Sequence, residues 1–128
     1  LMPQTLLIEP GDYAVCQLSP DDALPAWLRK GPFWTVTRAG DELSIICPDD
    51  VVPEDCSHEG GWRLLRMVGP FPFTLTGILE SVLAPLAAAD VGILAISTFN
   101  TDYVLVKHTR LAVATDALRA AGHVVRDA

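Results

Sequence analysis

Basic residues are few in this sequence. Nine lysines and arginines stand against 16 aspartates and glutamates in 128 residues, which gives a net charge of −7 and a pI of about 4.7. Proteins that bind nucleic acid present clustered lysine and arginine side chains to the phosphates, whereas the basic residues here are scattered along the chain. Nucleic acid is therefore not expected as a partner.

The sequence also lacks a long uncharged apolar run. Its most apolar region extends from Met67 to Thr101, but Glu80 and Asp90 interrupt it. A membrane-spanning helix needs roughly 18 or more consecutive apolar residues, so no membrane association is expected. Half of the residues are hydrophobic and a fifth are charged, which is typical of a folded chain rather than a disordered one.

Cysteines are too few for a disulfide framework. There are three, and the chain opens with no basic region followed by an apolar one. Cys16 and Cys47 lie inside apolar runs, where a thiol behaves as a small hydrophobe. Reduced thiols and a cytoplasmic location are therefore expected. Cys47, Cys56 and His58 lack the paired spacing of a zinc site, so no metal is predicted.

Sequence motifs of catalysis are missing as well. The chain contains no G-x-S-x-G, P-loop or G-x-G-x-x-G run, and its acidic stretch between Asp49 and Glu59 lacks the spacing of a calcium loop. His123 follows Gly122 at the end of an expected helix, where its charge suits the helix dipole, so its role is interpreted as structural. We expect a protein that is not an enzyme and needs no cofactor.

What the sequence does contain is a run of short apolar strands joined by polar turns. The expected strands are 13–18, 33–38, 42–47, 62–69, 93–98, 102–107 and 123–125. Helical spacing of apolar residues begins at Ile78 and again at Leu111, and a short helix is expected around residues 26–30. From Trp62 onward the order is β-α-β-β-α-β, the ferredoxin-like arrangement. The proline- and acid-rich stretch 48–61 is the best internal boundary, so the predicted units are 1–61 and 62–128.

The two halves repeat each other in kind. Shifted by 60 positions, FWTVTRAGDELSIIC lies over ILAISTFNTDYVLVK without a gap, so that Val36 matches Ile96 and Glu42 matches Asp102. Each copy is an apolar strand, a polar turn and a second strand that begins beside an acid. The repeat predicts two copies of one unit, the first with shortened helices.

These motifs resemble the ACT domain family of small-molecule-binding regulatory modules. APLA at 84–87, the STFNTD turn at 97–102 and the VTRAGDELSII hairpin carry the resemblance, which extends from about Tyr13 to Val125. Within the family the sequence is most similar to the branch of aspartokinase regulatory domains and CASTOR-type cytosolic arginine sensors. The resemblance implies an α+β fold of two tandem ferredoxin-like βαββαβ units with antiparallel sheets that pair side by side, and a homodimer.

The resemblance also implies a ligand site, because ACT domains commonly bind amino acids with the loop after the first strand and with the β2–β3 hairpin of the unit. Two positions depart from the pattern of the arginine sensors, which have an acid at the position of Leu75 and a glycine at the position of Pro72. The implied ligand-binding residues are Pro72, Phe73, Thr74, Leu75, Thr76, Gly77, Ser97, Thr98, Phe99, Asn100, Thr101 and Asp102.

The residue chemistry suits a zwitterion such as a free amino acid. The helix that starts near Gly77 offers unpaired N–H groups to a carboxylate, and Asp102 could accept an ammonium group. Two plainer interpretations stay open. The turn residues could serve only the backbone, and Thr74 or Thr76 could simply be the helix N-cap. Arg38 and Glu42 could form a degenerate second site or a solvated pair.

These observations lead to one prediction of function and one alternative. The chain is predicted to be a non-catalytic sensor module that binds an amino acid or a similar small zwitterion and acts by allosteric regulation of a partner that the sequence does not identify. The alternative is a structural or protein-interaction module without a ligand that mediates dimerisation.

Overall fold

The computed structural model describes residues 3–29 and 31–128. The chain divides into two compact units. One, called here the inserted unit, is Gly11–Trp62, and the other, called the split unit, is Leu1–Pro10 together with Arg63–Ala128. Among the described residues, no helix is long and apolar enough to cross a membrane.

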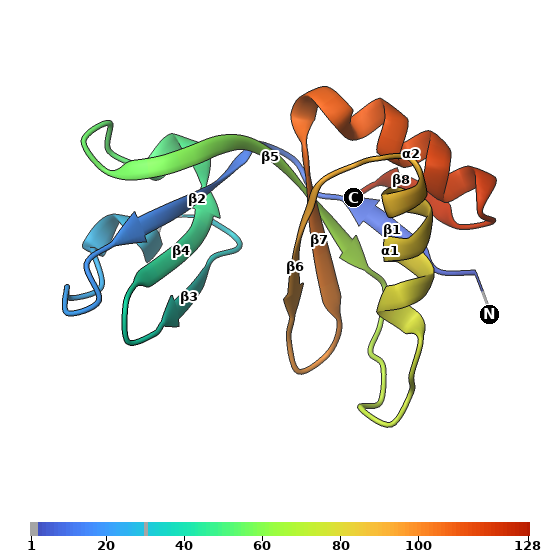
Figure 1. Ribbon diagram of the computed structural model, residues 1–128, viewed down its shortest axis with the longest axis horizontal. Coiled ribbons are helices and arrows are strands. Elements are labelled where there is room, and N and C mark those ends of the chain that lie inside the picture. The colour runs from blue at the N-terminus through green and yellow to red at the C-terminus, as the bar shows by residue number, and fades with distance from the viewer. Residues whose placement is uncertain (1–2, 30) are drawn as a thin grey trace. The chain divides into compact units, whose positions relative to one another are not determined.

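In its described residues, the inserted unit is an antiparallel sheet with two short 3-10 helices (Figure 1). Its strands lie in the order β3-β4-β2-β5. This is the strand order of a ferredoxin-like unit in which β2, β3, β4 and β5 are the first, second, third and fourth strands. The elements are β2 (Tyr13–Leu18), η1 (Ala26–Arg29), β3 (Thr35–Arg38), β4 (Leu43–Pro48), η2 (Asp49–Val51) and the first part of β5 (Ser57–Met67). The prediction of shortened helices in the first unit is confirmed.

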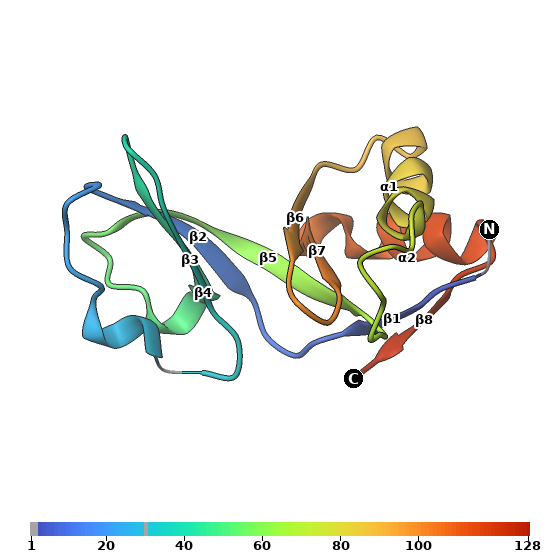
Figure 2. The same cartoon turned by 90° about the horizontal axis from the view of Figure 1, so that it is seen from below.

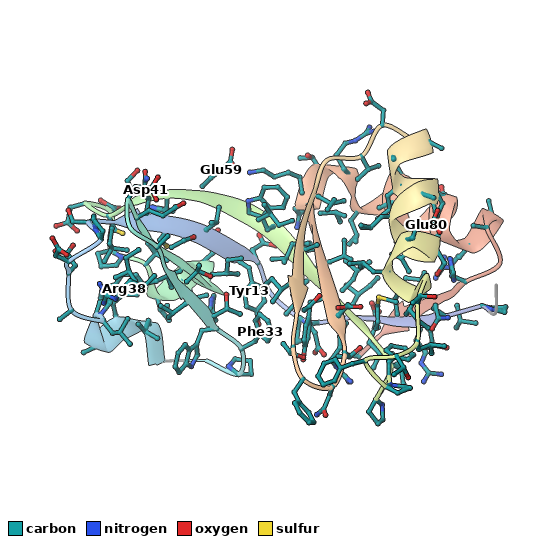
Figure 3. All side chains as sticks on the ribbon, turned by 60° about the horizontal axis from the view of Figure 1, so that its bottom comes forward. Tyr13, Phe33, Arg38, Asp41, Glu59 and Glu80 are labelled. Atoms are coloured by element: carbon teal, nitrogen blue, oxygen red, sulfur yellow. The ribbon has the colours of Figure 1, made fainter. Side chains whose placement is uncertain are left out.

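Apolar side chains from alternate strand positions fill the core of the inserted unit. Ala14 and Cys16 on β2 and Ile45 and Cys47 on β4 all point to the face that η1 covers with Leu28. The interpretation of Cys16 and Cys47 as buried hydrophobes is therefore confirmed. Tyr13 and Phe33 add an edge-to-face ring contact with centroids 6.0 Å apart (Figure 3).

The split unit is a five-stranded sheet with two α-helices on one face (Figure 1). Its strand order is β6-β7-β5-β1-β8, and all pairs with a described register are antiparallel except β1 with β8. The elements are β1 (Thr5–Ile8), the second part of β5, α1 (Ile78–Ala88), β6 (Ile93–Ser97), β7 (Asp102–Lys107), η3 (His108–Arg110), α2 (Leu111–Ala120) and β8 (Val124–Asp127).

Strand β1 is not among the strands that the sequence predicts. It lies between β5, to which it is antiparallel, and β8, to which it is parallel. A ferredoxin-like unit would pair β8 directly with β5, so the first residues of the chain widen the sheet by one strand. The structure thus places residues up to Pro10 with the second half of the chain, whereas the predicted division kept them in a first unit of residues 1–61.

The core of the split unit joins both helices to the sheet. Leu6 on β1, Met67 on β5 and Val104 on β7 all face this core and are fully buried. The remaining buried members are Ile8, Leu65, Val82, Leu86, Val91, Val106, Ala114, Leu118 and Val125. The helical periodicity from Ile78 and from Leu111 is confirmed, because the residues that the helices bury recur at helical spacing: Val82 and Leu86 on α1, and Ala114, Thr115 and Leu118 on α2.

His123 ties β1 to this core with two hydrogen bonds. The backbone N–H of Gln4 donates to Nδ1 at 2.9 Å, and Nε2 lies 2.8 Å from the carbonyl oxygen of Ser81 on α1. Because Nδ1 accepts, Nε2 carries the proton and donates. The side chain is buried. The structural role predicted for His123 is confirmed, although these two bonds replace the helix-dipole contact that the sequence suggested.

Candidate functional site

The loop before α1 and the β6–β7 hairpin meet at one end of the split unit (Figures 1 and 2). The loop begins after β5 and ends at Gly77, and the hairpin turn spans residues 98–101. The backbone N–H of Phe71 donates to the carbonyl oxygen of Asn100 at 2.9 Å. The structure thus brings together the two segments that the sequence analysis selected.

Thr101 anchors the hairpin to the sheet. Its side chain is 8% exposed, and Oγ1 donates to the carbonyl oxygen of Met67 at 2.6 Å. Thr98 closes the turn, because its backbone N–H donates to the carbonyl oxygen of Thr101 at 2.8 Å and its Oγ1 donates to the same oxygen at 3.0 Å. These bonds fix the backbone of the hairpin before any ligand is present.

Gly69 lets the loop and the hairpin approach each other. A Cβ atom at this position would lie 2.8 Å from the carbonyl oxygen of Asn100 and 3.2 Å from Cβ of Thr101. The first distance is shorter than any normal van der Waals contact and involves a backbone atom, which cannot move aside cheaply. A glycine is therefore required at this close approach.

Asp102 supplies negative charge at the first position of β7. Its carboxylate accepts a hydrogen bond from Ser97 Oγ, with 2.5 Å between Oγ and Oδ1, and the residue is half-buried. Ser97 and Asp102 are register partners across the β6–β7 ladder, so the sheet itself holds the pair together. The second carboxylate oxygen has no hydrogen-bond partner among the described residues and can accept one from a ligand.

Two phenylalanines form the outer wall. The rings of Phe73 and Phe99 are perpendicular, with an interplanar angle of 88° and centroids 5.3 Å apart. They are 76% and 81% exposed, and Leu75 beside them is 50% exposed. Such an edge-to-face pair is worth about 0.5–1.5 kcal/mol, and it links the loop to the hairpin on the solvent side.

Together these residues enclose a pocket of about 190 Å³. At roughly 30 Å³ for each water molecule, this volume suits a small metabolite. Asp102 is the one ionisable side chain among the described residues that line it. The lining residues are Phe71, Pro72, Phe73, Leu75, Ile78, Ser97, Thr98, Phe99, Asn100, Thr101 and Asp102.

Nine of the twelve residues predicted as ligand-binding line this pocket, and three do not. Thr74, Thr76 and Gly77 lie outside the lining. Phe71 and Ile78 line the pocket but were missed by the sequence analysis, although both flank the predicted loop and Ile78 opens the apolar stripe of α1. A wider window around the loop would have included them.

The start of α1 differs from the interpretation that a threonine caps it. The N-cap is Gly77, with φ of 80°, and no side chain makes a capping hydrogen bond. Thr74 and Thr76 are therefore not the N-cap. A positive φ is easily adopted only by glycine, so Gly77 sets the sharp turn by which the loop enters the helix.

The corresponding hairpin of the inserted unit has a different register from the predicted repeat. In the ladders, Arg38 pairs with Leu43 and Ser97 pairs with Asp102, so the two hairpins correspond with a shift of 59 positions. The predicted match of Glu42 with Asp102 at a shift of 60 is therefore wrong. Leu43, which is fully buried, occupies the place of the acid, so no acid among the described residues of the inserted unit stands at the position of Asp102.

Arg38 is the register counterpart of Ser97 in the inserted unit. Its guanidinium donates to the carbonyl oxygen of Pro20 and, at 2.7 Å, to that of Asp22, so it bridges β3 to the loop that precedes η1 (Figure 3). Among the described residues it makes no ion pair with Glu42. The hypothesis of an Arg38–Glu42 pair is therefore wrong. The Arg38 side chain instead donates to backbone carbonyl oxygens in a loop of its own unit.

Replacing Arg38 with methionine is expected to loosen this loop. The loss of two donors from a solvent-exposed guanidinium should change the free energy of unfolding by less than about 1 kcal/mol, but the Asp22 amide, bonded to the Ser19 carbonyl oxygen at 3.0 Å, should exchange with solvent several-fold faster. Hydrogen exchange followed by NMR measures this. Arg126→Met is the matched control, and equal acceleration in both variants would contradict the role assigned to Arg38.

The three cysteines gather in the inserted unit without forming a disulfide. The neighbouring thiol of Cys47, together with burial, raises the pKa of Cys16, and burial raises the pKa of Cys56. These two thiols therefore stay protonated at neutral pH. Among the described residues, no group of three or more histidine, cysteine, aspartate or glutamate side chains is placed to hold a metal ion.

Comparison with known families identifies the second half of the chain. A family model described as an ACT domain matches residues 57–120, which is half of the chain. The chain belongs to the ACT domain family. A separate model, described as an N-terminal domain, matches residues 11–55, nearly the whole of the inserted unit. The ACT match covers both segments that form the pocket.

Two individual proteins are similar to much of this chain. The rat protein named cytosolic arginine sensor for mTORC1 subunit 1 is 38% identical over 97 residues, which cover 69% of this chain and 29% of the rat protein. The chain therefore spans less than a third of this curated relative. A crystal structure of a protein from Agrobacterium tumefaciens is 39% identical with a TM-score of 0.94, covering all of this chain and 96% of that one.

More distant structures share the fold alone. The ligand-free regulatory subunit of aspartate kinase from Thermus thermophilus is 10% identical with a TM-score of 0.64, covering 91% of this chain and 96% of that chain. The predicted α+β fold of tandem ferredoxin-like units is confirmed, as is the resemblance to the ACT family and to the arginine sensors. The resemblance to aspartokinase regulatory domains is confirmed at the level of the fold.

Proposed function

We propose that this chain is a non-catalytic regulatory module of the ACT type that binds a free amino acid, or a similar small zwitterion, in the pocket between the loop before α1 and the β6–β7 hairpin. The observation that carries the proposal is the convergence of these two segments around a pocket whose lining contains one acid, Asp102. The name of the rat relative, an arginine sensor, supports an amino acid as the ligand class.

The pocket offers different partners to the two charges of a zwitterion. Asp102, with one oxygen already held by Ser97, accepts the ammonium group or a basic side chain. The uncapped N-terminus of α1 begins at Ile78, which lines the pocket, and its N–H groups suit a carboxylate. Charge-assisted bonds contribute about 1.5–3 kcal/mol each, so two of them with apolar contacts would support micromolar affinity, about −8 kcal/mol.

Regulation would follow from a difference in affinity between two states. A ligand shifts an equilibrium only as far as it binds one state better than the other. We place the protein in the cytoplasm and expect it to act as a homodimer through pairing of ACT units, with an allosteric effect on a protein partner. The relatives are sensors and regulatory subunits by name, which supports a role without catalysis.

A second candidate function is ligand-free dimerisation. It is favoured by the exposure of Phe73, Phe99 and Leu75, because exposed apolar clusters often mark protein contacts. The two functions differ in their response to amino acids. If the cluster serves only as a contact between copies, no amino acid will stabilise the protein, and Phe99→Ser will change its oligomeric state.

Thermal unfolding in the presence of each of the twenty amino acids tests the proposed function. A specific ligand at 100 times its Kd adds about 2.7 kcal/mol to stability. Asp102→Asn should weaken binding of that amino acid by about tenfold or more, because an amide cannot balance the ammonium charge. Isothermal titration calorimetry of both proteins measures the change.

The charge-matched control is Asp116→Asn, which removes an exposed acid from α2. Its affinity should equal that of the wild type. The amide that Asp102→Asn introduces can still accept the Ser97 hydrogen bond, so unfolding by urea should give the same midpoint as the wild type. A wild type that responds to none of the amino acids, or an Asp102→Asn variant with unchanged affinity, would contradict the proposed site.

A further inference from the structure

A second pocket lies beside the hairpin, on the sheet face that the helices leave open. Strand residues alternate between faces, and Leu65, Met67, Val104 and Val106 point into the helix-covered core. Arg66 and Tyr103 therefore belong to the other face. This pocket has a volume of about 230 Å³ and is lined by Arg66, Gly69, Pro70, Asn100, Thr101 and Tyr103.

Arg66 supplies the positive charge of this pocket. Its Nε donates to Glu9 Oε1 at 3.1 Å, and its side chain is 37% exposed. That ion pair holds the guanidinium plane in place from one edge. Within the described part of the chain, the two Nη groups have no hydrogen-bond acceptor, so their donors are available to an incoming group.

The other polar groups of the pocket complement this charge. The side-chain amide of Asn100 is exposed and has no hydrogen bond within the described residues. The Tyr103 phenol projects from β7 on the same face of the sheet as Arg66. Of the described residues that line the pocket, Arg66 is the one with a fixed charge. Its charge is opposite to that of Asp102 in the first pocket, although Asn100 and Thr101 line both.

We propose that this second pocket binds an oxyanion, the carboxylate or phosphate group of a small metabolite, through the free edge of the Arg66 guanidinium with the amide of Asn100 and the hydroxyl of Tyr103. A planar guanidinium presents parallel donors that match two oxygens of such a group. The Glu9 carboxylate fixes the guanidinium while leaving those donors unused. An anion here lies against the opposite side of the hairpin from the proposed amino-acid pocket.

NMR titration with two separate probes, inorganic phosphate and acetate, at constant ionic strength tests the proposal. The amides of Gly69, Thr101 and Tyr103 should shift saturably, and the probe that binds with the lower Kd identifies the oxyanion class. Arg66→Gln should raise the Kd of that probe by about tenfold or more. Arg66→Lys keeps the charge but loses the parallel donors of the guanidinium, so its Kd should lie between those of the wild type and Arg66→Gln.

Three controls separate a built site from general charge attraction. Arg126 faces the same side of the sheet, because both Arg66 and Arg126 are register partners of Leu7, and Arg126→Gln should leave the Kd unchanged. Glu9→Gln removes a negative charge beside the site, while its amide oxygen can still accept the hydrogen bond from Arg66 Nε that fixes the guanidinium, so the Kd should fall. Asp102→Asn should retain anion binding, which distinguishes this site from the amino-acid pocket.

The outcomes that overturn the proposal are specific. Shifts that grow linearly without saturation, an equal loss in Arg66→Gln and Arg126→Gln, or an unchanged Kd in Arg66→Gln would each show that Arg66 forms no anion site. The same NMR spectra report whether each variant is folded, so a loss of binding caused by unfolding is recognised directly.

Discussion

Alanine in place of Leu6 is expected to lower the free energy of unfolding by about 2–5 kcal/mol, the range for leucine-to-alanine changes in protein cores. Leu6 is 0% exposed and belongs to the core of the split unit. Its strand is bonded to β5 on one side and to β8 on the other, so the backbone cannot readily move to fill the cavity. Urea unfolding followed by far-UV circular dichroism measures the loss as a lower midpoint with an unchanged slope.

Leu7→Ala is the matched control for this prediction. Leu7 is the register partner of Arg66 and is half-buried, so its alanine variant should lose no more than about 1 kcal/mol. If the first ten residues were a detached arm, both variants would be nearly neutral. A neutral Leu6→Ala variant would therefore contradict the placement of β1 inside the sheet.

Strand β1 illustrates where sequence patterns fail. Residues 5–8 form a run of only four, TLLI, too short to show the period of a strand, and the partners β5 and β8 lie far along the chain. Pairing between such distant segments leaves no local signal. By contrast, α1 and α2 were predictable because buried residues such as Val82, Leu86 and Leu118 repeat with the period of a helix.

The two segments that form the pocket were predictable from the sequence, but the side chains that line it were predictable only in part. Residues 72–77 and 97–102 were identified from turn chemistry and family resemblance, and hydrogen bonds such as that of Phe71 with Asn100 bring them together. The direction of each side chain was not predictable. Thr74 and Thr76 lie outside the lining, whereas Leu75 between them belongs to it, and sequence spacing alone does not encode these directions.

The register of the repeat shows the same limit. A slip of one residue moves every side chain of a strand to the other face of a sheet. The sequence match at a shift of 60 placed Glu42 at the position of Asp102, and the ladders, at a shift of 59, place Leu43 there. Both shifts align apolar residues with apolar residues, so only the hydrogen-bonded pairs distinguish them.

Gly69→Ala is expected to lower the free energy of unfolding by about 1–3 kcal/mol, as over-packing does in well-packed regions. The added Cβ would lie 2.8 Å from the carbonyl oxygen of Asn100, so the loop and hairpin must separate. The bond from the Phe71 amide to that oxygen, 2.9 Å long, should then weaken. Faster exchange of the Phe71 amide with solvent, measured by NMR, together with a lower urea midpoint, checks both parts.

Gly92→Ala is the control that isolates this contact. A Cβ at Gly92 would meet nothing within 4 Å, and alanine at an unstrained glycine position is neutral or adds up to about 1 kcal/mol by restricting the unfolded chain. Gly69→Ala should therefore lower the free energy of unfolding, whereas Gly92→Ala should leave it unchanged or raise it. Because the loop and the hairpin also form the proposed amino-acid pocket, Gly69→Ala should lose the thermal response to that ligand while Gly92→Ala retains it, and an equal response in both would show that their close approach is not needed for binding.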